Sequence, residues 1–207
     1  MKRVKLVVAY DGTNYCGWQV QKNGETIESV LNRAIGELTG EEIHVMGSSR
    51  TDAGVHACGN VAVFDTEARM AADKFSYALN QRLPEDIRIQ DSCEVPADFH
   101  PRFQKTVKTY EYRILNREFP LPAYRFNSHF TYRKLDVERM RQAAAYLIGE
   151  HDFQSFCAAG AQVKTTVRTI YALDVEKQGD LIILRITGNG FLYNMVRIIA
   201  GTLMKIG

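Results

Sequence analysis

The sequence predicts an α+β fold that consists of two similar halves. Short stretches in which apolar and polar residues alternate are typical of half-buried strands, and longer stretches in which apolar residues recur every three or four positions are typical of amphipathic helices. Over residues 1–97 these patterns follow in the order strand, helix, strand, strand, helix, strand, which is the split βαβ or ferredoxin-like arrangement. The order begins again further along the chain, so we predict two domains, residues 1–105 and 106–207.

The first half begins with a strand and an amphipathic helix. Apolar side chains share one face of the strand at residues 2–10: Val4, Leu6, Val8 and Tyr10. Others recur at helical spacing after Gly24: Ile27, Val30, Leu31, Ala34, Ile35 and Leu38. Thr26 is the expected N-cap of this helix, and Gly40 is its expected end.

Shorter elements complete the first half. Strands are expected at residues 43–46 and 59–66, with Val61 and Val63 on one face of the second strand. The next helix uses Phe75, Ala78, Leu79 and Leu83 and stops at Pro84, because the residue before a proline disfavours helical geometry. A final strand starts at Ile87 and runs to Val95, and a linking loop follows.

The second half repeats the pattern with local changes. Strands are expected at residues 107–115 and 126–132, a helix from Asp136 to Gly149, a hairpin of residues 166–176 and 181–187, and a helix at residues 191–206. By the symmetry of the first half a closing strand should follow. Because the sequence stops at Gly207, we expect this strand to be absent, either because the sequence is truncated or because this version lacks it.

Composition limits the class of protein. An apolar content of 45% over 207 residues is enough for a buried core. Lys and Arg total 26 against 24 Asp and Glu, so the net charge of +2 does not by itself indicate a nucleic-acid partner. The cysteines lack zinc spacing: Cys16, Cys58, Cys93 and Cys157. Apolar runs stay short of the roughly 18 residues that a membrane span needs, so we expect a cytoplasmic protein.

The densest group of polar residues is the stretch Ser48-Ser49-Arg50-Thr51-Asp52-Ala53-Gly54-Val55-His56, which follows an expected strand. Loops between strands often present functional groups from a rigid scaffold, and Gly54 allows a sharp turn. Asp52 is the candidate catalytic residue, although an aspartate in a loop is by itself more often a turn residue. His56 could pair with Asp52 on a metal, but no third ligand has suitable spacing, so we interpret His56 as structural.

Other residues are ambiguous from the sequence alone. Trp18 could belong to a ligand surface, but core packing is the better interpretation. Tyr110 alone is an ordinary strand aromatic. Arg197 lies on a flank of the last helix, where an arginine is often solvated. If Arg197 were buried, it would need a carboxylate partner, and Asp52 is a candidate.

Motifs distributed over almost the whole chain carry a family resemblance. They are YDGTNYCGWQVQ (10–21), GSSRTDAGVHA (47–57), LPEDI (83–87), FHPRF (99–103), KTYEYRI (108–114), GEHDFQSF (149–156) and GNGFLYNMVRIIAGTL (188–203). On these residues the sequence resembles the tRNA pseudouridine synthase A family. RTDAGVH together with FLYNMVR is the specific combination.

The resemblance implies both a fold and an activity. The fold is two tandem ferredoxin-like halves whose antiparallel sheets join around an RNA-binding cleft. The activity is the isomerisation of uridine to pseudouridine at positions 38, 39 and 40 of the tRNA anticodon stem-loop, by a homodimer and without a cofactor or metal. Asp52 matches the catalytic aspartate and Arg50 the arginine two residues before it. Tyr110 is implied to stack on the target base, and Arg197 is implied to pair with Asp52.

The chemistry agrees with these roles. The reaction cleaves a C–N glycosidic bond and rejoins the base through carbon, and one carboxylate can attack the sugar or base or take a proton from the sugar. A nearby guanidinium favours the ionised carboxylate. A tyrosine can stack on a flipped base, and its hydroxyl could help to remove a proton from the newly bonded carbon. Expected phosphate contacts are Lys22, Arg102, Lys105, Lys108, Lys164 and Arg168.

Two rival functions remain open at this stage. The first is a catalytically impaired tRNA-binding protein that retains the fold. The second, a metal-dependent hydrolase, is weaker, and undiminished turnover in chelator would count against it. Tritium release from tRNA labelled at uridine C5 separates the enzyme from the binding protein.

Overall fold

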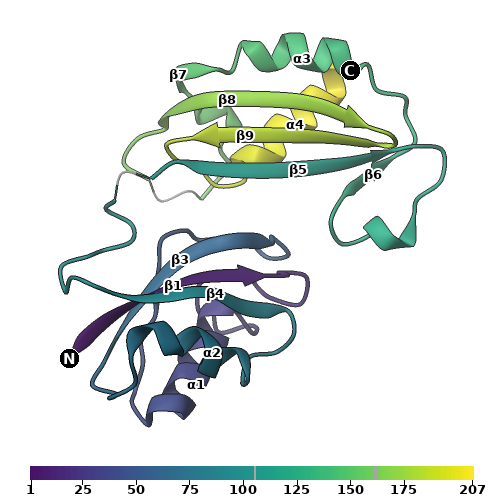
Figure 1. Cartoon of the computed structure of the whole chain (residues 1–207). Coiled ribbons are helices and arrows are strands. Elements are labelled where there is room, and N and C mark those ends of the chain that lie inside the picture. The colour runs from purple at the N-terminus through teal and green to yellow at the C-terminus, as the bar shows by residue number, and fades with distance from the viewer. Residues whose placement is uncertain (105, 161–162) are drawn as a thin grey trace. The chain divides into compact units, whose positions relative to one another are not determined.

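The computed structural model describes residues 1–104, 106–160 and 163–207. Over these residues the protein is of the mixed α+β class with two sheets. The chain divides into two compact units, Met1–Gln104 and the remainder to Gly207, and each unit has its own apolar core (Figure 1).

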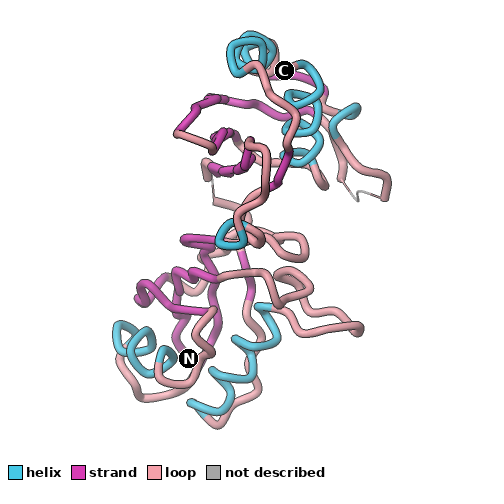
Figure 2. Tube along the Cα trace, turned by 90° about the vertical axis from the view of Figure 1, so that its right-hand side faces the viewer, coloured by secondary structure: helices cyan, strands magenta, loops and turns pink. Residues whose placement is uncertain are grey.

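The first unit is an antiparallel sheet covered by helices on one face. Its elements are β1 (Lys2–Tyr10), α1 (Ile27–Thr39), β2 (Met46–Gly47), β3 (Ala57–Thr66), α2 (Phe75–Asn80) and β4 (Ile87–Val95), with a 3-10 turn at Ala72–Lys74. The strand order is β2-β3-β1-β4. In Figure 1 and Figure 2 the helices α1 and α2 lie on the same side of this sheet. The predicted face of β1 is buried there, since Val4, Leu6 and Val8 are completely inaccessible.

Helix α1 begins and ends as its sequence predicts. The Thr26 hydroxyl accepts from the backbone N–H of Ser29, and the Ser29 hydroxyl accepts from the N–H of Thr26, which satisfies N–H groups that the first turn leaves open. Gly40 ends the helix with a φ of 76°. This left-handed conformation is one that glycine adopts without steric cost.

Two expectations for the first unit need correction. The strand expected at residues 43–46 is reduced to Met46–Gly47, because the Ile43 and Val45 side chains are buried in the core while the Val45 N–H donates to the Asn32 side chain. Helix α2 ends at Asn80, three residues before Leu83. In β3, Val61 and Val63 share one face as expected, and Ala62 and Phe64 on the opposite face belong to the core.

The second face of this sheet is partly covered by the segment after β4. The Arg3 guanidinium donates two hydrogen bonds to Asp65, at 2.8 and 2.7 Å, and a third to the Phe99 carbonyl at 3.0 Å. Further along, Nε of Arg102 donates to the Gly47 carbonyl at 2.9 Å, and the intervening Pro101 is buried. Val63, on this face, is inaccessible to solvent.

The Arg3–Asp65 pair predicts a specific acid sensitivity. Hydrogen bonds from Arg3 lower the pKa of Asp65, so the pair stabilises the folded state above the carboxyl's unfolded pKa of about 3.9 and stops doing so as pH falls through the lower folded pKa. We expect Asp65→Asn to lose about 1 kcal/mol of unfolding free energy at neutral pH and to flatten the decline in acid. Urea unfolding from pH 7 to 3 measures both. Asp91→Asn, at an exposed position on the same face, should keep the wild-type decline; an equal flattening there would contradict the assignment.

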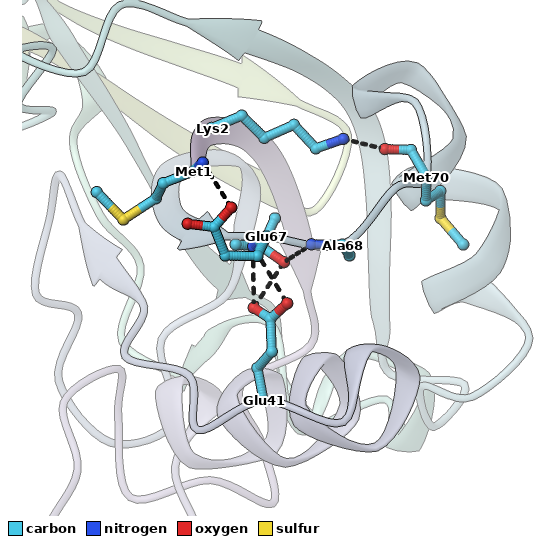
Figure 3. A network of polar contacts seen from close by, with 7 residues as sticks. Met1, Lys2, Glu41, Glu67, Ala68 and Met70 are labelled. Atoms are coloured by element: carbon cyan, nitrogen blue, oxygen red, sulfur yellow. Dashed lines mark hydrogen bonds and ion pairs between the residues drawn. The ribbon is translucent and has the colours of Figure 1, made fainter.

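The start of β1 is held by carboxylates at the end of the sheet opposite to Tyr10 (Figure 3). The amino group of Met1 lies 2.6 Å from the Glu67 carboxylate, and the Lys2 ammonium donates to the Met70 carbonyl. Glu41 accepts from the Thr66 hydroxyl and from the Glu67 N–H. The Met1–Glu67 pair is exposed and contributes little stability. The network therefore serves mainly to fix the position of the first residues of β1.

The second unit contains a sheet of order β6-β5-β9-β8-β7, in which β6 pairs parallel to β5 and the other pairs are antiparallel. Its elements are β5 (Lys108–Asn116), β6 (His129–Thr131), α3 (Val137–Ala145), β7 (Gly149–Asp152), β8 (Val167–Gln178), β9 (Leu181–Gly188) and α4 (Met195–Ile206), with 3-10 turns at Pro122–Tyr124 and Gln154–Phe156. Side chains of α3 and α4 form one core with those of β5, β8 and β9.

The predicted hairpin of β8 and β9 and the Asp136 cap of α3 are confirmed. Other boundaries differ. The strand expected at 126–132 shortens to β6, and β7 forms where the sequence analysis expected the end of a helix, so α3 stops at Ala145. Helix α4 starts at Met195 instead of 191, because Asn194 adopts a φ of 57° and interrupts the helix there. Among the described residues, no helix is long and apolar enough to span a membrane.

Candidate active site

The polar stretch Ser48–His56 forms the connection from β2 to β3, and the side chain of Asn60 holds its beginning. The Ser48 hydroxyl donates to Oδ1 of Asn60 at 3.0 Å, and Nδ2 of Asn60 donates to the Ser49 carbonyl at 3.1 Å. Asn60 is 6% exposed, so these bonds are shielded from competing water. The loop therefore starts from a fixed position on β3.

A second segment, residues 11–25 between β1 and α1, supports the middle of this loop. The backbone N–H of Trp18 donates to the Thr51 carbonyl at 3.0 Å. The Trp18 carbonyl accepts from the backbone N–H of Glu28 in the first turn of α1. The Tyr10 hydroxyl lies 2.8 Å from the Thr51 hydroxyl. Gly17 allows the two segments to approach, since a Cβ on it would lie 2.5 Å from the Thr51 carbonyl oxygen. Thr51 is thus fixed through both its backbone and its side chain.

Trp18 packs in the core, as the sequence analysis favoured. Its side chain is completely buried, and its ring lies against Gly47, where a Cβ would come within 2.4 Å of the indole. The ring centroid of Tyr10 is 5.9 Å away. Trp18 is therefore a support under the loop and is not part of a ligand surface.

Asp52 follows Thr51 directly and is half-buried, whereas Arg50 is exposed. On the far side of Asp52 the chain turns back: the Val55 N–H donates to the Asp52 carbonyl at 3.1 Å, and Gly54 has a φ of 75°. The Val55 carbonyl packs against Gly12, where a Cβ would lie 2.1 Å away. The backbone is fixed by contacts on both sides of Asp52. Its carboxylate is therefore attached at a defined position, as a catalytic group requires.

His56 connects the end of the loop to the end of β1. Its Nδ1 lies 2.9 Å from the Asp11 carboxylate and 3.2 Å from the Gly12 nitrogen. Asp11 also accepts from Thr13, and the Thr13 hydrogen bonds, with the nearby His56, lower the pKa of Asp11. Over the described residues no group of three or more His, Cys, Asp or Glu side chains could hold a metal ion. These contacts fit the structural role expected for His56.

The other candidate residues lie in the second unit. Tyr110, on β5, is half-buried, and its ring meets Phe191 edge to face at 4.9 Å. Arg197 is exposed in the first turn of α4. It lies near Tyr112, which follows Tyr110 on the same face of β5: burial raises the pKa of Tyr112, and the charge of Arg197 opposes that rise. Tyr110 and Arg197 thus belong to one unit, and Asp52 and Arg50 to the other.

The expected phosphate contacts have different surroundings. Lys22 and Lys164 are exposed and Lys108 is half-buried. Arg102 donates to the Gly47 carbonyl, directly before the Asp52 loop, which is a structural role. Arg168 donates to the Thr165 carbonyl, and Lys105 lies outside the described residues.

The residues that support the loop carry no signal in the sequence. Asn60, Tyr10 and Gly17 position Asp52 through contacts that join distant parts of the chain. The alternation that includes Tyr10 indicated a strand, and nothing in its spacing indicated a bond to Thr51.

Comparison with known proteins identifies the class. A family model described as tRNA pseudouridine synthase matches residues 6–104 and 143–207. The chain therefore belongs to the tRNA pseudouridine synthase family. Arg50, Asp52 and Arg197 fall inside the matched ranges, and Tyr110 falls between them.

Individual relatives carry a more particular name. A protein of Acetivibrio thermocellus named tRNA pseudouridine synthase A is 50% identical over 207 residues, which is 100% of this chain and 85% of the relative. Proteins of the same name from Ruminiclostridium cellulolyticum and Citrifermentans bemidjiense are 49% and 48% identical, again over 100% of this chain and over 85% and 83% of their own lengths.

Proposed function

We propose that the protein isomerises uridine to pseudouridine in tRNA, at positions 38, 39 and 40 of the anticodon stem-loop, with Asp52 as the catalytic carboxylate. The observation that supports this most directly is that hydrogen bonds from Trp18 and Tyr10 fix the loop around Asp52, in a chain of the tRNA pseudouridine synthase family. We further propose that it acts as a homodimer in the cytoplasm, where its tRNA substrate is found.

The reaction sets clear demands on the site. The bond from uracil N1 to ribose C1′ breaks, a bond from uracil C5 to C1′ forms, the hydrogen on C5 leaves as a proton, and N1 gains a proton. Electrons balance without an oxidant or reductant. The Asp52 carboxylate would begin this sequence by attacking the sugar or the base, or by removing a proton from the sugar. A fixed carboxylate lowers the barrier because it does not have to be oriented anew in each turnover.

The other candidates have supporting roles in this proposal. Arg197 pairs with Asp52 and favours its ionised form. Tyr110 stacks on the target base, and its hydroxyl assists the loss of the C5 proton. Arg50, exposed two residues before Asp52, contacts the RNA, and a guanidinium suits phosphate geometry.

We also propose that each unit is a ferredoxin-like domain, with residues 1–105 and 106–207 as the two halves. The strand order β2-β3-β1-β4 in the first unit supports this, because it results from a βαββαβ chain with antiparallel neighbours. In the second unit β5, β9 and β8 are adjacent in the order of β1, β3 and β2 of the first, with α3 and α4 on their shared face.

Tritium release tests the proposed activity. Unmodified tRNA carrying tritium at uridine C5 should lose the label to water in the presence of the protein, because C5 exchanges its hydrogen for the bond to C1′. Sequencing of the product after a pseudouridine-specific reagent locates the modified positions. Tight tRNA binding without tritium release would instead support the alternative, a catalytically impaired tRNA-binding protein that retains the fold.

The proposed pairing of Arg197 predicts a shift in pH dependence. We expect Arg197→Ala to lower kcat by about tenfold to a hundredfold and to move the acidic limb of the kcat–pH profile upward, since Asp52 would ionise less readily. Arg197→Lys should restore part of the rate. Arg139→Ala, which removes an exposed arginine on α3, is the control. A rate within twofold of wild type and an unshifted acidic limb would rule the pairing out.

A further inference from the structure

The connection from β5 to α3, residues 117–134, displays aromatic side chains to solvent. Phe119 is 66% exposed, Phe126 55% and Tyr132 71%. Large aromatic side chains dominate the energetics of contacts when they are buried, and several exposed ones on a single segment are typical of an interaction surface. The whole segment falls between the ranges that the family model matches, so family membership does not assign it a role. We refer to residues 117–134 as the aromatic–basic loop.

Cations accompany these aromatic rings. The Arg125 guanidinium lies 4.1 Å from the centroid of the Phe126 ring, and Arg133 and Lys134 are exposed beside Tyr132. The loop contains four Lys and Arg residues, Arg117, Arg125, Arg133 and Lys134, and a single acidic residue, Glu118. Its formal charge of +3 exceeds the +2 of the complete chain. The charge suits a polyanion.

Hydrogen bonds within the loop and from Asn116, at the end of β5, order its backbone. Nδ2 of Asn116 donates to the Thr131 and Arg133 carbonyls, and Oδ1 of Asn116 accepts from the Leu135 N–H at 3.2 Å. The Tyr124 carbonyl accepts from the Ser128 hydroxyl at 2.9 Å. Because the backbone is already ordered by these bonds, a ligand would not have to order it on binding, which preserves affinity.

We propose that the aromatic–basic loop binds unpaired nucleotides of the tRNA substrate, with a base stacked on Phe126 and adjacent phosphates near Arg125 and Arg133. Unpaired bases are what proteins stack on aromatic and arginine side chains, whereas RNA duplexes offer mainly backbone and 2′-hydroxyl groups. The inference deepens the proposed function and rests on tRNA being the substrate. The loop acts in binding and takes no part in the chemical step.

Substitutions at Phe126 distinguish stacking from general apolar contact. Phe126→Ala and Phe126→Leu should each weaken tRNA binding by about tenfold, because neither retains a π-face, and Phe126→Tyr should bind like wild type. Arg125→Ala should reduce the slope of log K against log salt by roughly 0.7 to 0.9, as expected for one lost phosphate contact. Filter binding of unmodified tRNA at several salt concentrations gives both quantities. Tyr146→Ala and Lys177→Ala remove an exposed aromatic and an exposed cation elsewhere in the unit and should leave binding unchanged.

Two further measurements separate the possible outcomes. Tritium release at saturating tRNA should stay at the wild-type rate in the Phe126 variants; an inactive wild type would refute the proposed function and not the loop assignment. Light scattering reports the oligomeric state. If Phe126→Leu binds tRNA like wild type, stacking is refuted. If Phe126→Ala changes the oligomeric state and leaves tRNA affinity intact, the surface is a protein interface and the proposal is overturned.

Discussion

Asp52→Asn is expected to lower the single-turnover rate of pseudouridine formation by roughly a thousandfold or more while changing tRNA affinity by less than about threefold. The amide keeps the size and hydrogen-bonding capacity of the side chain but can act neither as a nucleophile nor as a base. The backbone bonds that hold the loop involve the Thr51 and Asp52 carbonyls and do not require the carboxylate. The loop should therefore keep its conformation, and the loss should be confined to kcat. Rapid-quench assays with excess enzyme measure the rate.

The control for Asp52 is another aspartate of the same unit. Asp73→Asn removes an exposed carboxylate that pairs with Lys74 on the short turn before α2, and it should leave the rate unchanged. Thermal unfolding of both variants establishes that they are folded. Wild-type turnover in Asp52→Asn would exclude this residue as the catalyst, and an equal loss in Asp73→Asn would indicate a general effect on the fold.

Gly17→Ala is expected to slow turnover by displacing the Asp52 loop. The added Cβ would lie 2.5 Å from the Thr51 carbonyl oxygen and 3.2 Å from the carbonyl carbon of Asp52, so the loop must move. Gly17 also has a φ of 86°, which alanine adopts only with strain of about 1 kcal/mol. We expect kcat to fall at least about tenfold, since small misplacements of a catalytic group reduce rates strongly.

Gly40→Ala is the control that separates the effect of backbone strain from the effect of displacing the Asp52 loop. Gly40 has a similar φ of 76°, but no described atom lies within 4 Å of the Cβ that would be added. Both variants should lose roughly 1 kcal/mol of unfolding free energy or somewhat more, measured by urea denaturation. Only Gly17→Ala should lose turnover. Equal kcat values in the two variants would show that the Gly17–Thr51 contact does not position Asp52.

The sequence predicted elements whose pattern is local. The alternation in β1 and the spacing in α1 with its Thr26 cap depend on neighbouring residues, and both elements formed as expected. Ile43 and Val45 have the composition of a strand, but the core buries them without strand pairing, and only contacts with distant residues decide that. The same holds for β6, a short edge strand whose partner is β5.

The residues of the candidate site differ in the same respect. Asp52 could be predicted because polar residues cluster around it in the sequence. The residues that support its loop could not be predicted, because Tyr10 and Thr51 are 41 residues apart and the Asn60 amide contacts a loop whose path is set by the sheet. A turn residue and a catalyst are both compatible with an aspartate in a polar loop, and the supporting contacts are what favour the catalyst.

Trp18 links the mobility of the Asp52 loop to that of helix α1. Its backbone N–H donates to the Thr51 carbonyl, and its carbonyl accepts from Glu28 in the first turn of α1. Its ring is buried in the core. We therefore expect the loop and the start of the helix to open together, because Trp18 makes hydrogen bonds to both. Such coupling would raise the free energy that local opening of the loop requires. In the proposed reaction this coupling would keep the carboxylate in position between one tRNA and the next.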